Sequence, residues 1–150
     1  MAEVQRMVSD MTQTITVIST DLAPAPAGHY SQGITAGSQL YISGQLPVRA
    51  DGSLCLDTDF QAQAAQAMSN MLAVLQAAGG EPRHLVKVTA YIVGVANWPE
   101  FNTVYASMLP DVRPARTVVP VTELHHGFLV EIDAVGAVGG SDPSATELLS

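Results

Sequence analysis

Residues that build disulfides, zinc clusters and nucleic-acid surfaces are scarce in this chain. Its 150 residues include a single cysteine, Cys55, which excludes an internal disulfide and a zinc site made of several thiolates. Only six residues are Lys or Arg, against 14 Asp or Glu, and the net charge is −8. Such a charge disfavours binding to phosphate backbones and to anionic membrane surfaces. We therefore expect neither a nucleic acid nor a membrane as a partner.

Long apolar segments are also lacking. No segment approaches the roughly 20 apolar residues of a membrane span, and the N-terminus has no apolar run typical of a signal peptide. A soluble, cytoplasmic protein is the expectation. Hydrophobic residues nevertheless make up 47% of the chain, enough for one sizeable core. We expect a single domain over residues 1–150, with its core at about 12–138 and flexible tails at both ends.

The apolar pattern predicts five strands. They are expected at 12–20, 37–46 and 84–95, and in the segments ARTVVPVTEL and FLVEIDAVGAV near the C-terminal end. Asp51-Gly52 marks a hairpin turn, after which a short return strand can follow. The segment 21–33 contains several Pro and Gly residues and is expected to be an irregular loop with extended pieces.

Helical spacing of apolar residues predicts two helices. The first is expected from Thr58 to Ala78, where Thr58 and Gln61 match a capping box and a pair of glycines follows the last turn. The second is expected at 97–109, with Asn97 as its N-cap. The order of strands and helices predicts an α+β layer with both helices on one face of a mixed sheet. Since two helices cannot cover both apolar faces, association of sheet face against sheet face is the simplest solution.

Two of the few cations lie in an otherwise apolar segment, RPARTVVPV. These are Arg113 and Arg116. A guanidinium group is planar and permanently charged, and it can hold a carboxylate by two parallel hydrogen bonds. The residues alone leave open whether Arg116 binds a substrate or forms a structural salt bridge, whereas Arg113 is expected to be exposed.

Six segments between about residue 20 and residue 138 carry a joint pattern. They are PAPAGHYSQGI, LYISGQLP, QAQAAQAMSNMLAVLQAAG, VKVTAYIVGVANWPEFNTVYASML, PDVRPARTVV and LVEIDAVGAV. In this order and spacing they resemble the Rid/YjgF family of reactive-intermediate deaminases. The resemblance implies a chorismate-mutase-like fold with a mixed six-stranded sheet and two helices on one face. It also implies a homotrimer in which three sheets form a central barrel and the active sites lie between subunits.

The resemblance also implies a reaction. Family members hydrolyse enamines of the 2-aminoacrylate type, through the imine tautomer, to a 2-oxo acid and ammonia, and they use no cofactor. The expected partner is therefore a small imino or enamino acid. Two alternatives stay open. One is a family deaminase acting on 2-aminomuconate or on an intermediate of pyrimidine catabolism. The other is a non-enzymatic protein: one that binds 2-oxo acids or other metabolites without turnover, a chaperone-like protein, or an RNA-directed factor, which the charge disfavours.

Three residues match catalytic positions of the family. The resemblance implies that Arg116 grips the substrate carboxylate, that Glu131 positions water or moves protons, and that the Tyr30 hydroxyl donates to substrate or water. Asp133 lies two residues after Glu131 and shares its strand face. The residues alone cannot choose between these two acids, and the resemblance selects Glu131.

Four further residues are implied to bind the substrate. Ser43 and Gly44 would line the cleft, and the backbone N–H of Val118 would be a second donor to the carboxylate. Asn102 aligns with a family asparagine and is expected to have a structural or supporting polar role.

Three histidines depart from the family pattern. His29 directly precedes Tyr30, while His125 and His126 replace a turn that more often contains proline. His29 could alter the loop or add a titrating group at the cleft. Because adjacent side chains point apart on an extended chain, the pair is not expected to bind a metal. Cys55 is expected to be a small buried residue rather than a nucleophile.

Overall fold

The structure is a computed structural model that describes residue 2 and residues 14–139. The tails expected at the two ends fall almost wholly outside these residues. Among the residues described, no helix has the length and apolar character needed to cross a membrane.

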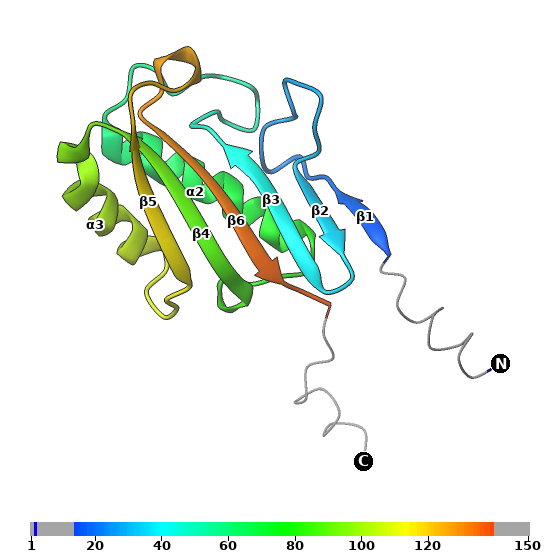
Figure 1. Cartoon of the computed structure of the whole chain (residues 1–150). Coiled ribbons are helices and arrows are strands. Elements are labelled where there is room, and N and C mark those ends of the chain that lie inside the picture. The colour runs from blue at the N-terminus through cyan, green and yellow to red at the C-terminus, as the bar shows by residue number, and fades with distance from the viewer. Residues whose placement is uncertain (1, 3–13, 140–150) are drawn as a thin grey trace.

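Six strands form one mixed sheet (Figure 1). Their order in space is β1-β2-β3-β6-β4-β5. Only the β4–β5 pair is parallel among the pairs described, and the others are antiparallel. The strands are β1 (Ile15–Ile18), β2 (Gly33–Ala36), β3 (Gln39–Gln45), β4 (Leu85–Val93), β5 (Ala115–Val121) and β6 (Val130–Ala137).

Two α-helices lie behind the sheet in the view of Figure 1. They are α2 (Phe60–Ala77) and α3 (Trp98–Met108), and α2 packs on β3, β6 and α3. Three short 3-10 helices join the elements: η1 (Pro82–His84), η2 (Val95–Asn97) and η3 (His125–Gly127). This arrangement confirms the predicted α+β fold with two helices on one face of a mixed six-stranded sheet.

Helix α2 forms where apolar residues recur at helical spacing, but its cap differs from the prediction. Asp59, not Thr58, is the N-cap, and its carboxylate accepts a hydrogen bond from the Ala62 N–H at 2.8 Å. The Thr58 hydroxyl instead donates to the Cys55 carbonyl at 2.8 Å. The predicted capping box is therefore wrong, because the preceding turn engages the Thr58 side chain.

Strand β2 was not predicted from the apolar pattern. It has only four residues and pairs Gly33–Ala36 with Ile42–Gln39 of β3. A short strand that follows a Pro- and Gly-rich segment resembles the end of a loop. The turn at Asp51-Gly52 forms as predicted, with Gly52 at φ 89°, but its return segment makes only the isolated bridge Val48–Leu54.

The two faces of the sheet have different surroundings. Apolar side chains under the helices are buried, including Leu40, Ile42, Val88, Ile92, Val130 and Ile132. The opposite face carries Tyr41, Thr89, Tyr91, Glu131, Asp133 and Val135, which are half-buried or exposed. No described element covers that face, so the predicted association of sheet faces has a surface available to it.

Candidate active site

A cavity of about 630 Å³ lies where β3 ends and β6 begins. Its walls come from the segments 24–32, 43–54 and 125–131. Four of the predicted site residues line it together: Tyr30, Ser43, Gly44 and Glu131. The volume is in the range of pockets that hold small molecules. The fold thus brings residues far apart in the sequence to one concave site.

The loop before β2 is held in place by Gln32, a residue that the sequence reasoning did not single out. Its side-chain amide donates to the carbonyls of Thr20 at 3.1 Å and Pro24 at 2.8 Å, and its amide oxygen accepts from the Thr20 N–H at 2.7 Å. Gln32 is buried and itself lines the cavity. Its place in the matched segment PAPAGHYSQGI was the only signal that could have found it.

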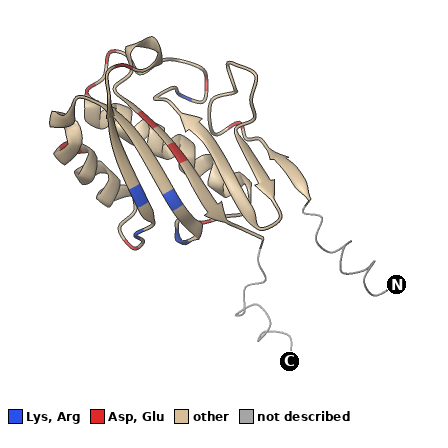
Figure 2. Cartoon of the chain, viewed as in Figure 1, with Lys and Arg blue, Asp and Glu red and all other residues tan. Residues whose placement is uncertain are grey.

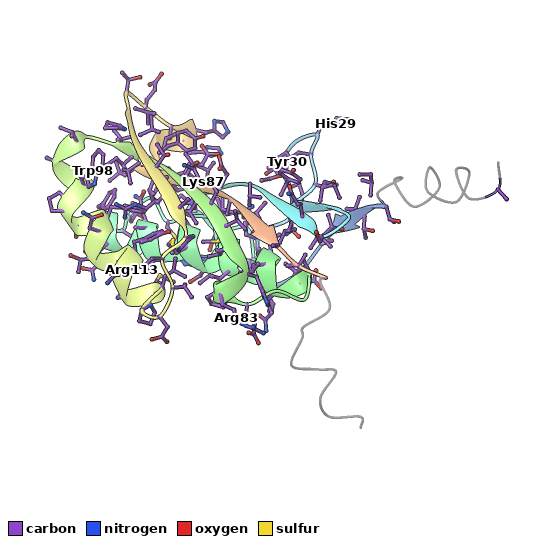
Figure 3. The ribbon with its side chains drawn as sticks, turned by 60° about the horizontal axis from the view of Figure 1, so that its bottom comes forward. His29, Tyr30, Arg83, Lys87, Trp98 and Arg113 are labelled. Atoms are coloured by element: carbon purple, nitrogen blue, oxygen red, sulfur yellow. The ribbon has the colours of Figure 1, made fainter. Side chains whose placement is uncertain are left out.

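Tyr30 and His29 are neighbours in this loop but lie differently. Figure 3 shows His29 at the outer tip of the loop and Tyr30 nearer the sheet. Tyr30 lines the cavity and is 51% exposed, whereas His29 is exposed and is not among the lining residues. His29 therefore adds no titrating group to the cavity wall of the single chain.

Ser43 ties the loop to the sheet. Its hydroxyl donates to the Ser31 carbonyl at 2.5 Å, and its N–H donates to the Gln32 carbonyl at 3.0 Å. The hydroxyl proton is thus directed toward the protein, and the oxygen can still accept a hydrogen bond from a ligand. Ser43 serves both the shape of the cavity and its polarity.

Gly44 leaves room for the carboxyl group of Glu131. A Cβ atom at position 44 would overlap the Glu131 Oε1 atom. The β3–β6 register shifts between Ile42 and Gln45, which marks a bulge at this point of the strand. A side chain at position 44 would therefore force the Glu131 carboxyl group to move from the place it occupies here.

The surroundings of Glu131 favour its neutral form. Burial raises the pKa of its carboxyl group, the nearby negative charge of Asp133 raises it further, and His125 lowers it. Asp133 itself accepts a hydrogen bond from the Tyr91 hydroxyl at 3.1 Å and does not line the cavity. Of the two acids on this face of β6, the geometry places Glu131 at the site.

Arg116 lies outside this cavity in the single chain. It is exposed on β5, and its Cζ atom lies 4.9 Å from the centre of the Tyr105 ring and 5.8 Å from that of Phe101. Among the described residues it forms no salt bridge. The described part of the chain therefore gives this arginine no salt-bridge partner. Its guanidinium group lies over two aromatic rings, and its hydrogen-bond donors remain available.

Val118 and Asn102 are also separate from the cavity. Val118 is buried on β5, two residues after Arg116, and Asn102 is exposed on α3. The predicted site is therefore split in one chain, with an acid half at the β3–β6 cavity and an arginine half on β5 and α3.

The adjacent histidines do not point apart, and that prediction is wrong. His126 has φ 59°, in the left-handed region, and its ring centre lies 3.8 Å from that of His125. The chain is not extended here, because η3 turns it before β6 begins. Both histidines line the cavity. Within residues 14–139, no group of three or more His, Cys, Asp or Glu side chains is arranged to hold a metal.

Residues 20–138 match the family model described as Endoribonuclease L-PSP. The chain belongs to the Rid/YjgF family. A RutC family protein of Pyrococcus horikoshii is 38% identical over 119 residues, which are 79% of this chain and 94% of that protein. The 2-iminobutanoate/2-iminopropanoate deaminase of Dermatophagoides farinae is 35% identical over 119 residues, 79% of this chain and 93% of that one.

A solved structure of the same family has a similar fold. The Rid protein YyfA of Yersinia pestis is 38% identical and superposes with a TM-score of 0.79, covering 83% of this chain and all (100%) of that one. For a Rid/YjgF protein, the cavity described above supplies a half-buried carboxyl group, a tyrosine hydroxyl and a serine oxygen. Such groups can position and deprotonate water next to a small bound molecule.

Proposed function

We propose that this Rid/YjgF protein hydrolyses 2-imino and enamino acids of the 2-aminoacrylate type to 2-oxo acids and ammonia. The observation that carries the proposal is the carboxyl group of Glu131, with its raised pKa, in a cavity that also holds Tyr30 and Ser43. The relative of Dermatophagoides farinae that is named as a deaminase supports the reaction class.

The proposal includes a homotrimer with active sites between subunits. In one chain Arg116 and the Glu131 cavity are separate, so a complete site needs both halves from two chains. The uncovered sheet face and the position of β5 at the sheet edge support such an arrangement. Arg116 of one subunit, helped by the N–H of Val118, then grips the substrate carboxylate beside the acid of its neighbour.

The roles follow from the chemistry of an imine. The C=N carbon is electrophilic, so a positioned water and a proton acceptor suffice to begin hydrolysis. Glu131 accepts the proton of the attacking water, and Tyr30 orients the substrate or the water by its hydroxyl. Surroundings that raise the pKa of Glu131 make its carboxylate a stronger base than an exposed glutamate.

Arg116→Ala tests this function. We expect ammonia release from enzymatically generated 2-iminobutanoate and 2-aminoacrylate to fall by roughly 100-fold or more, since two charge-assisted hydrogen bonds to the carboxylate are lost. Arg116→Lys is expected to recover only part of the rate, because an amine lacks the planar fork. Arg113→Ala is the matched control, as Arg113 is an exposed arginine of the same segment. Wild-type turnover by a folded Arg116→Ala protein would contradict the proposal.

A second deaminase substrate is the main alternative. An intermediate of pyrimidine catabolism and 2-aminomuconate therefore belong in the same assay. The ratio of kcat/KM values over this panel identifies the preferred substrate. Binding of a 2-oxo acid without any turnover would identify a binding protein instead.

The matching family model is described as Endoribonuclease L-PSP, but the charge of this chain argues against RNA. The net charge is −8, and Figure 2 shows Lys or Arg segments on β4 and β5 beside Asp or Glu segments on β6 rather than a continuous basic surface. Filter binding of RNA at low salt tests this. Retention that weakens as salt rises would favour the RNA alternative.

A further inference from the structure

Two histidines that depart from the family pattern line the same cavity as Glu131. His125 and His126 form the 3-10 helix η3 directly before β6, the strand that carries the acid. Nothing in the proposed roles of Arg116 or Tyr30 uses them. An imidazole group in a small-molecule cavity can both donate and accept a proton near neutral pH, so its position there calls for a chemical role.

The backbone holds this pair in an unusual conformation. His126 adopts a left-handed φ of 59°, which non-glycine residues rarely do. The next residue, Gly127, also has a positive φ, of 78°. The conformation places the His126 ring against His125 on one side and edge-on to Phe128 on the other, with ring centres 3.8 Å and 5.9 Å apart. Phe128 is fully buried. His125 is therefore supported by a stack of rings that is anchored in the core.

The cavity wall around His125 holds two carboxyl groups, those of Glu131 on β6 and Asp51 in the turn across the cavity. Its other titratable side chains are Tyr30 and His126, and Asp133 lies outside the cavity. A positive charge on His125 lowers the pKa of Glu131, against burial and the repulsion of Asp133. The two groups are therefore electrostatically coupled, since protonated His125 favours the ionised form of Glu131.

We propose that His125, held in place by His126, is the proton donor to the substrate nitrogen, and that it works as a pair with Glu131. The inference rests on the proposed deaminase function and goes beyond it by assigning the acid of the reaction. Tyr30 on the cavity wall is another candidate donor, but a phenol is in general a weaker acid than an imidazolium.

The step balances as follows. Water attacks the carbon of the protonated imine, the C–O bond forms, the π electrons move to nitrogen, and the Glu131 carboxylate takes one water proton. Protonated His125 then gives its proton to the nitrogen of the carbinolamine. The C–N bond breaks with its electron pair on nitrogen, the carbonyl forms, and the hydroxyl proton returns to His125. The proton on Glu131 leaves with ammonia as ammonium, which completes the products: a 2-oxo acid and ammonium.

His125→Gln tests the donor role by turnover. We expect kcat for 2-iminobutanoate to fall by about 100-fold, the low end of the range for general acid catalysis, with KM nearly unchanged. In the pH–rate profile of the wild type, the rate should fall at high pH as His125 loses its proton. This high-pH limb of the profile should be absent in His125→Gln. The limb at low pH should move to higher pH, because Glu131 loses a neighbouring positive charge. A merely structural role would lower the rate and leave the limbs in place.

Two further variants separate the role of His125 as proton donor from that of His126, which holds it in place. His29→Gln is the matched control, since His29 lies at the loop tip and does not line the cavity, and its pH profile should equal that of the wild type. His126→Gly relieves the left-handed backbone but removes the ring stack. It should therefore fold well, lose part of kcat and keep the high-pH limb that His125 causes.

A titration of the Glu131 carboxyl carbon by ¹³C NMR tests the pair without turnover. We expect the pKa of Glu131 to be higher in His125→Gln than in the wild type and unchanged in His29→Gln. An unchanged pKa in His125→Gln would overturn the pairing, and wild-type kcat in that variant would overturn the donor role. A wild-type protein that releases no ammonia from any imine of the panel would overturn the proposed function, and the donor role with it, whatever the titration shows.

Discussion

Glu131 and Asp133 project from the same face of β6, yet their surroundings differ. Asp133 accepts a hydrogen bond from Tyr91, while Glu131 lies against Gly44 at the cavity. Alternation along a strand predicts that the two share a face, but it cannot tell which one meets a cavity. That distinction depends on the β3 bulge and on loops from elsewhere in the chain, so at the residue scale the sequence alone left two candidates.

The raised pKa of Glu131 predicts a pH-dependent contribution to stability. A carboxyl group whose pKa is higher in the folded than in the unfolded state binds more protons when folded, so the free energy of unfolding falls as pH rises from about its ordinary value of 4.5 through the raised value. Glu131→Gln removes the ionisable carboxyl group and, with it, this fall in the free energy of unfolding. We therefore expect the variant to be more stable than the wild type at pH 7–8 and equal to it near pH 4, and to have lost the proposed activity.

Thermal unfolding across this pH range measures the effect. Glu123→Gln is the control, since Glu123 is exposed and outside the cavity. A Glu131→Gln protein that is less stable than the wild type at pH 8 would show that the carboxylate is stabilised, not strained, in the folded state.

At the scale of elements, long segments were predictable and short ones were not. Helix α2 and strands β3 to β6 follow from periodicity over many residues, with boundaries wrong by about two residues at the start of α2. Strand β2 has four residues, and its pairing with β3 depends on tertiary structure. The left-handed φ of His126 was not predictable either, since a non-glycine residue rarely adopts it, and it accompanies a ring contact with the buried Phe128.

The loop of residues 20–32 depends on one buried side chain. Replacing Gln32 by Leu leaves the Thr20 N–H and the carbonyls of Thr20 and Pro24 without their partner. We expect a loss of about 1–3 kcal/mol in the free energy of unfolding, measured by urea denaturation, and faster amide exchange in this loop. Gln39→Leu is the control, because Gln39 is exposed and bonds only the Tyr41 hydroxyl among the described contacts. Equal effects of the two substitutions would contradict this role of Gln32.

At the scale of the whole molecule, the open face of the sheet is the largest feature that one chain leaves unexplained. It combines apolar side chains such as Tyr41, which is 48% exposed, with the acids of β6. Sequence patterning predicts that this face must be covered, but neither the number of subunits nor the distance from Arg116 to the neighbouring cavity follows from it. Only the resemblance supplied the trimer, which stays a prediction.

A charge on the open face should prevent that assembly. Val135 lies on β6 next to Tyr41 in the register of the sheet, so Val135→Asp places a carboxylate where two sheets would meet. We expect the variant to elute as a monomer in size-exclusion chromatography with light scattering, and to lose activity because the arginine and acid halves separate. Val95→Asp, at a site that is 65% exposed outside the sheet, should remain assembled and active. An assembled, active Val135→Asp protein would contradict an interface on this face.

The contact between Gly44 and Glu131 has a consequence for how this sequence can evolve. A Cβ atom at position 44 overlaps the far end of the Glu131 side chain, so a larger residue there is expected to displace the carboxyl group rather than the backbone. We expect that shortening Glu131 to aspartate withdraws the carboxyl group from Gly44 and makes room for alanine at position 44. The effect of a substitution at position 44 is therefore expected to depend on the residue at position 131, because a Cβ atom at 44 displaces the acid only while the longer glutamate side chain is present.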